Sequence, residues 1–313
     1  MPTLVAEAMR RVPHPIEKVY DALRDFRTWP EWSPWLIADP DCTVDVDEDS
    51  ISVGSGYRWR GEIVGEGSLE HTRLDEPHRI DCDLDFIKPF RSHAEIHFDL
   101  RSDEDNATTV TWHMDGRLPA FLFWMKSQMQ TMITMDYERG LKRLDAYLET
   151  GRVPAKLDIE SRPITPDPVA ILGRSGHCKF EDIESSIGSV LEGVQDAVER
   201  NEVQHSSMMG TAYTKVDLKR GTFDYFTGVV ASAEVGEVDG LSRLVVGGDP
   251  SATLRLIGSY RYLDDAWNVV YQNVRGRGWK VGRSPGFEIN RNDPKTTAED
   301  RLVTDVYVPL KKF

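Results

Sequence analysis

The 313-residue sequence contains little cysteine and no long apolar run. Its cysteines, Cys42, Cys82 and Cys178, are far apart and include no Cys-x-x-Cys pair, which argues against a disulfide framework and a zinc ribbon. We therefore expect reduced thiols and a cytoplasmic location. No run of about 18 apolar residues occurs, so we expect no membrane span. The N-terminus lacks a basic stretch followed by an apolar one, so we expect no secretory signal.

Positive charge is also scarce. Lysine and arginine number 38 against 52 aspartates and glutamates, which gives a formal net charge of −14 at pH 7. Affinity for nucleic acids depends on Lys and Arg displacing counterions, and anionic lipid headgroups repel an acidic surface. We therefore expect a small-molecule ligand, apolar or cationic, rather than nucleic acid or a membrane as the partner. The composition gives no oligomeric state.

Catalytic and cofactor motifs are absent as well. There is no Ser/His/Asp order, no P-loop and no dinucleotide-binding glycine pattern, so we expect no cofactor. His93, Glu95 and His97 alternate along one expected strand and are metal-ligand types. Because the apolar Ile96 and Phe98 occupy the other face, the His/Glu face is expected to be the wet one, and we predict no metal site.

The first half has the pattern of an antiparallel sheet and one long helix. Apolar and charged residues alternate cleanly over 80–86 and 94–100, as in a sheet packed on one side only. Strands are expected over residues 43–48, 56–64, 67–74, 79–86, 92–100 and 107–114. A helix is expected from Pro119 to Glu149, because its apolar residues recur every three or four positions. They are Leu122, Met125, Met129, Met132, Met135, Leu141, Leu144 and Leu148. A helix lying across a curved sheet leaves a ligand cavity between them.

The second half contains an internal repeat of strand, helix, strand, strand. The first copy is expected over 169–231 and the second over 253–309, with a cleft where the two copies meet. With about 150 residues per domain, the length predicts two domains. Proline-bearing stretches separate them. We therefore expect a domain over 1–152, a linker over 153–165 and a domain over 166–313, both in the α+β class.

Short motifs in a fixed order make the first half resemble the START-like helix-grip superfamily, also called SRPBCC or polyketide cyclase/dehydrase-like. The motifs are Val12-Pro13-His14-Pro15, Val19-Tyr20, Trp29-Pro30-Glu31-Trp32, Tyr57-Arg58-Trp59-Arg60-Gly61, Gly65-Glu66-Gly67, Phe86-Ile87-Lys88-Pro89, Thr109-Val110-Thr111-Trp112 and Arg139-Gly140-Leu141-Lys142-Arg143-Leu144. The resemblance implies a curved antiparallel sheet around a long C-terminal helix, with a cavity for lipids, polyketides or other apolar ligands. Its candidate lining is Trp59, Phe86, Trp112, Met125, Met129 and Met132. For these residues, ordinary core packing is the alternative.

The second half resembles a gyrase-inhibitor-like (GyrI-like) domain, the effector-binding module of some AraC-type and MerR-type regulators. The motifs are Gly210-Thr211-Ala212-Tyr213, Gly258-Ser259-Tyr260, Ala266-Trp267, Phe287-Glu288-Ile289, Asn292-Asp293-Pro294 and Thr304-Asp305-Val306-Tyr307-Val308-Pro309-Leu310. The resemblance implies that Glu288 lies on a strand lining the central cleft. Two residues later the family often has Tyr, and this chain has Asn290. The regulators also carry a helix-turn-helix module, which this chain lacks, so we do not expect a one-chain transcription factor.

The candidate ligand-binding residues of the second half are Glu288, Tyr213, Tyr260, Trp267 and Tyr307, where aromatic walls suit planar or cationic ligands. For Trp267, plain core is the alternative, because it lies on the apolar stripe of its helix. We predict a protein that binds small apolar, amphipathic or cationic molecules and acts in sequestration, sensing or detoxification. Two enzymatic alternatives stay open. One is hydrolysis of reactive electrophiles, with Glu288 and Tyr260 or Tyr213 as the catalytic pair. The other is a cyclase-like or lyase-like activity of the first domain.

Overall fold

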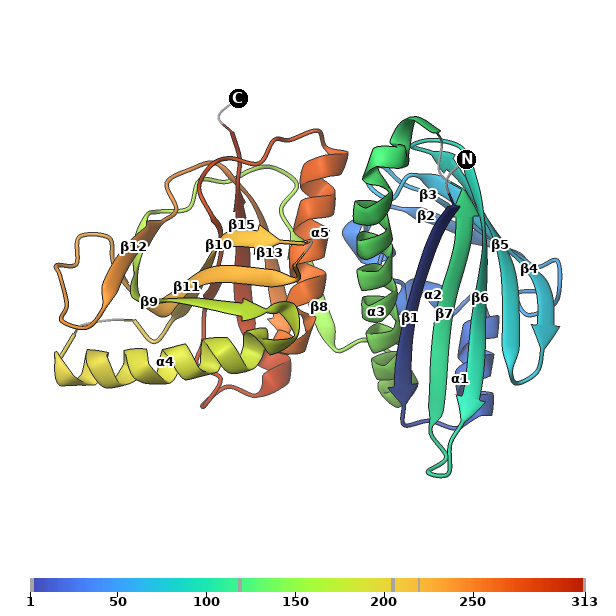
Figure 1. The fold of residues 1–313 in the computed structure, drawn as a ribbon, viewed down its shortest axis with the longest axis horizontal. Helices are drawn as coiled ribbons and strands as arrows, with labels where there is room; N and C mark the ends of the chain where they lie inside the picture. Colours follow the sequence, from blue (N-terminus) through green and yellow to red (C-terminus); the bar gives the residue numbers. More distant parts are fainter. Residues whose placement is uncertain (1–2, 118–119, 204–205, 219, 312–313) are drawn as a thin grey trace. The chain divides into compact units, whose positions relative to one another are not determined.

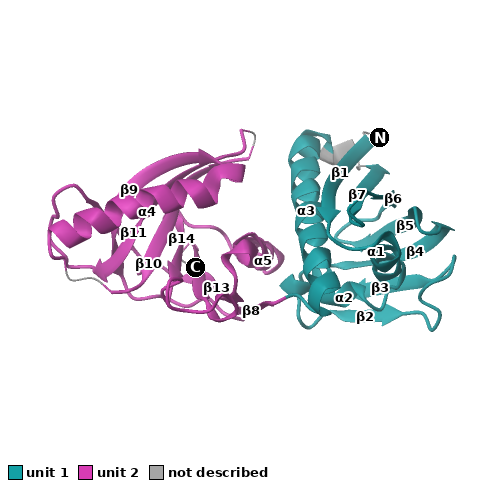
Figure 2. Ribbon diagram, turned by 90° about the horizontal axis from the view of Figure 1, so that it is seen from below, with its two compact units in different colours: residues 1–153 teal, residues 154–313 magenta. Residues whose placement is uncertain are grey.

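The computed structural model describes residues 3–117, 120–203, 206–218 and 220–311 (Figure 1). The chain divides into two compact units, residues 1–153 and residues 154–313 (Figure 2). Each unit contains one antiparallel sheet and few helices, so the α+β prediction is confirmed.

Unit 1 is a seven-stranded antiparallel sheet with the strand order β1-β7-β6-β5-β4-β3-β2. Its strands are β1 (Thr3–Val12), β2 (Thr43–Val46), β3 (Gly56–Arg60), β4 (Glu66–Asp75), β5 (Arg79–Lys88), β6 (Ser92–Ser102) and β7 (Thr108–Arg117). Its helices are α1 (Ile16–Arg24), α2 (Trp29–Trp32), the 3-10 turns η1 (Leu36–Ala38) and η2 (Ala120–Met125), and α3 (Lys126–Thr150). Strand β3 ends earlier than expected because Gly61 N–H donates to Gly65 O at 2.8 Å, which closes a turn.

The long helix α3 packs on β1 and covers the dry face of the sheet, as the alternating pattern predicts. In its C-terminal half, the side chains of Tyr137, Leu141 and Leu144 are fully buried. The helix ends at Thr150 and is capped by Gly151, whose φ of +75° lies in the left-handed region. Pro119, where the helix was expected to begin, and the side chain of Leu122 lie outside the described residues. The helix-grip prediction is confirmed.

Unit 2 is an eight-stranded antiparallel sheet with the order β12-β9-β11-β10-β14-β15-β13-β8. Its strands are β8 (Ala155–Ile159), β9 (Val169–Lys179), β10 (Met209–Asp217), β11 (Thr222–Ser232), β12 (Ser242–Val246), β13 (Ser251–Gly258), β14 (Gly286–Asn290) and β15 (Val303–Pro309). Helix α4 (Ile183–Arg200) packs on β9 and β11. Helix α5 (Leu263–Gly276) packs on β13 and β15.

The expected repeat of strand, helix, strand, strand is confirmed as β9-α4-β10-β11 and β13-α5-β14-β15. The two copies join where β10 pairs with β14, with Thr211 directly opposite Glu288. This pair therefore lies at the pseudo-twofold axis of the sheet, which is where the repeat predicts a ligand site.

The segment expected to be a free linker, residues 153–165, is mostly part of unit 2. Strand β8 pairs with β13, and Ile164 forms a bridge to Ser251. The alternation of Ala155, Leu157 and Ile159 with exposed residues is too short to stand out between flanking prolines. An edge strand has only one neighbour, so its pattern is weak.

Candidate functional site

Strand β14 places Glu288 inside the C-terminal domain. Neighbouring side chains on a strand point to opposite faces. Phe287 and Ile289 enter an apolar cluster with Tyr307 on one face, while Glu288 faces α5 on the other. Glu288 is only 3% exposed, so the charge of its carboxylate is largely shielded from water.

Two aromatic side chains hold the Glu288 carboxylate. The indole Nε1 of Trp267 on α5 donates to Oε2 at 2.7 Å, and the Tyr213 hydroxyl on β10 donates to Oε1 at 3.4 Å. The two rings meet edge to face, with centroids 5.1 Å apart. A Cβ at Gly286 would lie 3.0 Å from the Trp267 ring, so the glycine allows the indole to lie close to the strand.

Burial dominates the electrostatics of this site. It raises the pKa of Glu288 to about 7, although the hydrogen bonds from Trp267 and Tyr213 oppose the shift. Burial, and then the charge of Glu288, raises the pKa of Tyr213 well above its ordinary value. Within the described ranges, no lysine or arginine forms an ion pair with Glu288. The site is therefore a buried acid without a counterion.

Tyr260 is half-buried and close enough to feel the charge of this carboxylate. It opens the 3-10 turn Tyr260–Tyr262 that leads into α5. Its hydroxyl is buried and makes no hydrogen bond to the residues that the structure describes. Burial raises the pKa of Tyr260 to about 12, and the charges of Glu288 and Asp293 add to the shift. A buried hydroxyl without a partner is costly, so this one is suited to a water or ligand atom.

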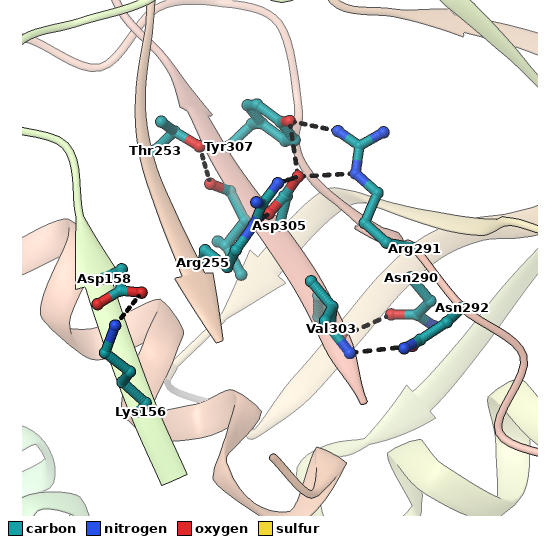
Figure 3. A network of polar contacts seen from close by, with 12 residues as sticks. Lys156, Asp158, Thr253, Arg255, Asn290, Arg291, Asn292, Val303, Asp305 and Tyr307 are labelled. Carbon is teal, nitrogen blue, oxygen red and sulfur yellow. Dashed lines mark hydrogen bonds and ion pairs between the residues drawn. The ribbon is translucent and has the colours of Figure 1, made fainter. Parts of the chain in front are cut away.

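Tyr307 does not join the other candidates. It stacks on Phe287, with ring centroids 4.7 Å apart, on the opposite face of the sheet from Glu288. Its hydroxyl accepts a hydrogen bond from Arg291 at 2.8 Å and is 3.4 Å from Asp305 (Figure 3). The structure therefore brings together Glu288, Tyr213 and Trp267, with Tyr260 nearby, and leaves Tyr307 in a separate polar network.

Further residues beside Glu288 escaped the sequence analysis. Thr211, opposite Glu288, shares a 2.8 Å hydrogen bond with Thr227 on β11. Tyr225 lies opposite Tyr213, and its hydroxyl is 2.6 Å from Ser186 on α4. For Thr211, the signal was the repeat itself, because residues at its twofold axis must face one another. The strand register needed to use that signal is not visible in the sequence.

The candidates in the first domain divide into buried and half-buried residues. Trp112 stacks on Tyr137 at 4.1 Å and is packed edge-on by Trp35 at 5.6 Å, within a closed aromatic core. Trp59 and Phe86, 5.8 Å apart, pack against this core and are partly exposed. The half-buried methionines of the helix side are Met125, Met129 and Met132.

The histidines of β6 lie on the wet face. His93 contacts Asp85 at 3.0 Å, and His97 stacks on His113 of β7 with centroids 4.6 Å apart. Across the described ranges, no three His, Cys, Asp or Glu residues are grouped to hold a metal ion.

None of the helices that the structure describes is long and apolar enough to cross a membrane.

Comparisons with known proteins assign each half. Residues 3–149 match the family described as polyketide cyclase / dehydrase and lipid transport, and residues 158–311 match the GyrI-like small molecule binding domain. No curated protein matches the chain.

Among similar solved structures, CalU16 from Micromonospora echinospora is 15% identical with a TM-score of 0.33, covering 48% of this chain and 88% of its own. The Aha1 dimer from Colwellia psychrerythraea is 20% identical with a TM-score of 0.36, and the match covers 47% of this chain and 98% of its own. TTHA0849 from Thermus thermophilus is 19% identical with a TM-score of 0.37, and the match covers 47% of this chain and 98% of its own. From the two family matches, the chain consists of a helix-grip domain of the polyketide cyclase/dehydrase and lipid transport family followed by a domain of the GyrI-like small-molecule binding family.

Proposed function

We propose that the C-terminal domain binds organic cations at Glu288, and that the protein acts in sequestration, sensing or detoxification of such molecules. The observation that carries the proposal is the nearly complete burial of Glu288 with two neutral donors and no described ion-pair partner. A buried carboxylate is costly unless it is paired with a cation or protonated. A cationic ligand therefore removes a cost that the ligand-free domain bears.

The aromatic residues around Glu288 suit the same ligand. Trp267 and Tyr213 meet the carboxylate and one another, so a cation that pairs with Glu288 lies beside both rings. The faces of aromatic rings attract cations, most strongly where water is excluded. In the structure described, the indole and phenol donors occupy the carboxylate oxygens, so a ligand competes with them for Glu288.

Substituting Glu288→Gln tests this function. The amide keeps the shape and removes the charge, so affinity for the cationic dye rhodamine 6G is expected to fall by about 1–3 kcal/mol, the scale of a charge-assisted hydrogen bond. Binding of the neutral dye Nile red is expected to stay unchanged. Fluorescence titration measures both. The matched control is Glu184→Gln, an exposed carboxylate on α4 of the same domain. Equal loss of both dyes, or loss in the control, contradicts cation binding.

A specific observation favours a second function, hydrolysis of reactive electrophiles. The unpartnered hydroxyl of Tyr260 lies within the electrostatic reach of Glu288. In this reaction Glu288 takes a proton from a water molecule while the oxygen of that water attacks an epoxide carbon. The carbon–oxygen bond of an epoxide breaks, and Tyr260 donates a proton to the leaving oxygen. The same Glu288→Gln variant then loses turnover of styrene oxide while keeping its affinity, because a general base acts mainly in the transition state.

We also propose that the N-terminal domain binds apolar ligands beside the first half of α3. Trp59, Phe86 and Met129 pack against the core of this domain yet remain partly exposed. Flexible methionine side chains adapt to ligands of different shape. The closed aromatic packing around Trp112 leaves the partly exposed residues as the ligand-facing part of the domain.

A further inference from the structure

A polar network lies on the face of the C-terminal sheet opposite Glu288. Its centre is Asp305 on β15, directly paired with Ile289 of β14. Arg255 on β13 and Arg291, one residue beyond β14, converge on this carboxylate, and Tyr307 borders it (Figure 3). The network shares no residue with the site around Glu288.

Both guanidinium groups bind the same aspartate. Arg255 donates from Nε to Oδ1 at 2.6 Å and from Nη2 to Oδ2 at 2.8 Å, and Arg291 donates from Nε to Oδ2 at 2.7 Å. The Asp305 side chain is 4% exposed. Its burial acts to raise its pKa, but the hydrogen bonds and charges of the two arginines lower the pKa below its usual value. Asp305 is therefore a fixed negative charge that holds the two arginines close together.

The network has one more positive charge than negative. Asp305 neutralises one guanidinium, and Lys156 is paired with Asp158 at 2.8 Å on the neighbouring strand. The Arg255 side chain is 52% exposed and that of Arg291 37%, so both present donors to solvent.

The unused donors lie on the two guanidinium groups. Arg291 donates from Nη2 to the Tyr307 hydroxyl. Its Nη1 has one acceptor within the part of the chain that the structure describes, the Met208 sulfur at 3.6 Å, which is a weak one. Among the described residues, Nη1 of Arg255 makes no hydrogen bond. These donors are available to an oxyanion.

We propose that Arg255 and Arg291 together bind the carboxylate group of a small organic acid, at a second site separate from Glu288. A carboxylate carries a single charge, which matches the single excess positive charge of the network. A phosphate dianion carries twice that charge, so it would exceed the excess of the network and be repelled more strongly by Asp305. The planar guanidinium fork also matches the two oxygens of a carboxylate.

Stabilisation of the sheet alone does not need the second arginine. In the other domain, a single arginine suffices for Asp47: the half-exposed Arg58 binds this carboxylate with both Nη atoms, at 2.7 and 3.4 Å, and its Nη1 also lies 3.8 Å from Asp45. At Asp305, Arg255 already supplies the two-pronged bond. Adding Arg291 places like charges side by side, an arrangement that a bound anion stabilises.

Binding of benzoate to the full chain tests this site, measured by NMR of arginine Nε–H groups in ¹⁵N-labelled protein. Benzoate is expected to shift the Arg255 and Arg291 signals, and the neutral benzamide is not. Arg255→Gln is expected to weaken benzoate binding about tenfold or more, since a charge-assisted hydrogen bond is lost. The matched control Arg58→Gln removes an equally exposed arginine of an Asp pair and is expected to leave the benzoate Kd unchanged.

A second variant is expected to strengthen benzoate binding instead of weakening it, so a loss of folding cannot produce the expected result. Asp305→Asn removes the competing negative charge and is expected to tighten benzoate binding. Weaker or unchanged binding by that variant, with the protein folded by circular dichroism, overturns the proposal. So does an absence of shifts at Arg255 and Arg291. Inorganic phosphate binding as tightly as benzoate would overturn the assignment to a carboxylate.

Discussion

At the scale of single residues, the proposed function of Glu288 comes with a cost in stability. Its carboxylate is buried by the packing of α5 over β14, and its two partners are neutral donors. Neutral hydrogen bonds offset only part of the loss of hydration of a charge. Burial therefore raises the pKa of Glu288 to about 7, and the ionised carboxylate lowers the stability of the domain.

The pH dependence of stability follows from this cost. The pKa of Glu288 is raised to about 7 in the folded state, against an unfolded value of about 4.3. Between these values the folded state holds a proton that the unfolded state releases, so stability falls as pH rises. Relative to Glu288→Gln, wild type is expected to lose about 3 kcal/mol of unfolding free energy between pH 4 and pH 8. Urea unfolding of both proteins at several pH values measures this, and parallel profiles would contradict it.

From the sequence, Glu288 could be singled out as a candidate site residue, but its contacts could not be predicted. Glu288 could be identified because the motif around it resembles a family motif. The bond from Trp267 could not, since it depends on how α5 packs over Gly286. Tyr307 was grouped with Glu288 although it lies on the other face. Because 12 residues separate β14 from β15, the sequence does not show the strand register that pairs Phe287 with Tyr307.

At the scale of elements, strands with one wet face were predictable, and the two edge strands of the second sheet were not. Strands β5 and β6 each have two neighbours and one buried face, so their alternation is complete. Strands β8 and β12 lie at the edges of the second sheet, are five residues long, and were not predicted. Each of them buries too few residues to leave a clear pattern in the sequence.

The two halves of α3 are expected to respond differently to enlargement. Met129 in the first half is partly exposed, so Met129→Trp is expected to fill the proposed apolar site, weakening Nile red binding with little change in melting temperature. Leu141 in the second half is fully buried, so Leu141→Trp is expected to overpack the core and cost about 1–3 kcal/mol or more. Calorimetry and dye titration separate these outcomes. A large loss of stability in Met129→Trp with unchanged dye affinity would show solid core instead.

At the scale of the whole molecule, two domains with separate sheets share one chain. Neither sheet borrows a strand from the other unit, as far as the described residues show. Each unit carries its own hydrophobic clusters around its own sheet. The presence of two domains could be predicted from the chain length and the prolines. The position of the boundary could not, because it depends on the pairing of β8 with β13.

That pairing makes the boundary testable with two fragments that differ only in their start. Residues 154–313 keep β8, whereas residues 166–313 expose the edge of β13 from Leu254 to Gly258. An uncovered edge strand presents unpaired backbone groups and invites association. We therefore expect the longer fragment, like residues 1–153, to be monodisperse and to unfold in one cooperative transition. The shorter one should melt at a lower temperature and aggregate, as measured by scanning calorimetry and light scattering. Equal behaviour of both C-terminal fragments would mean that β8 is dispensable and that the boundary lies near residue 166.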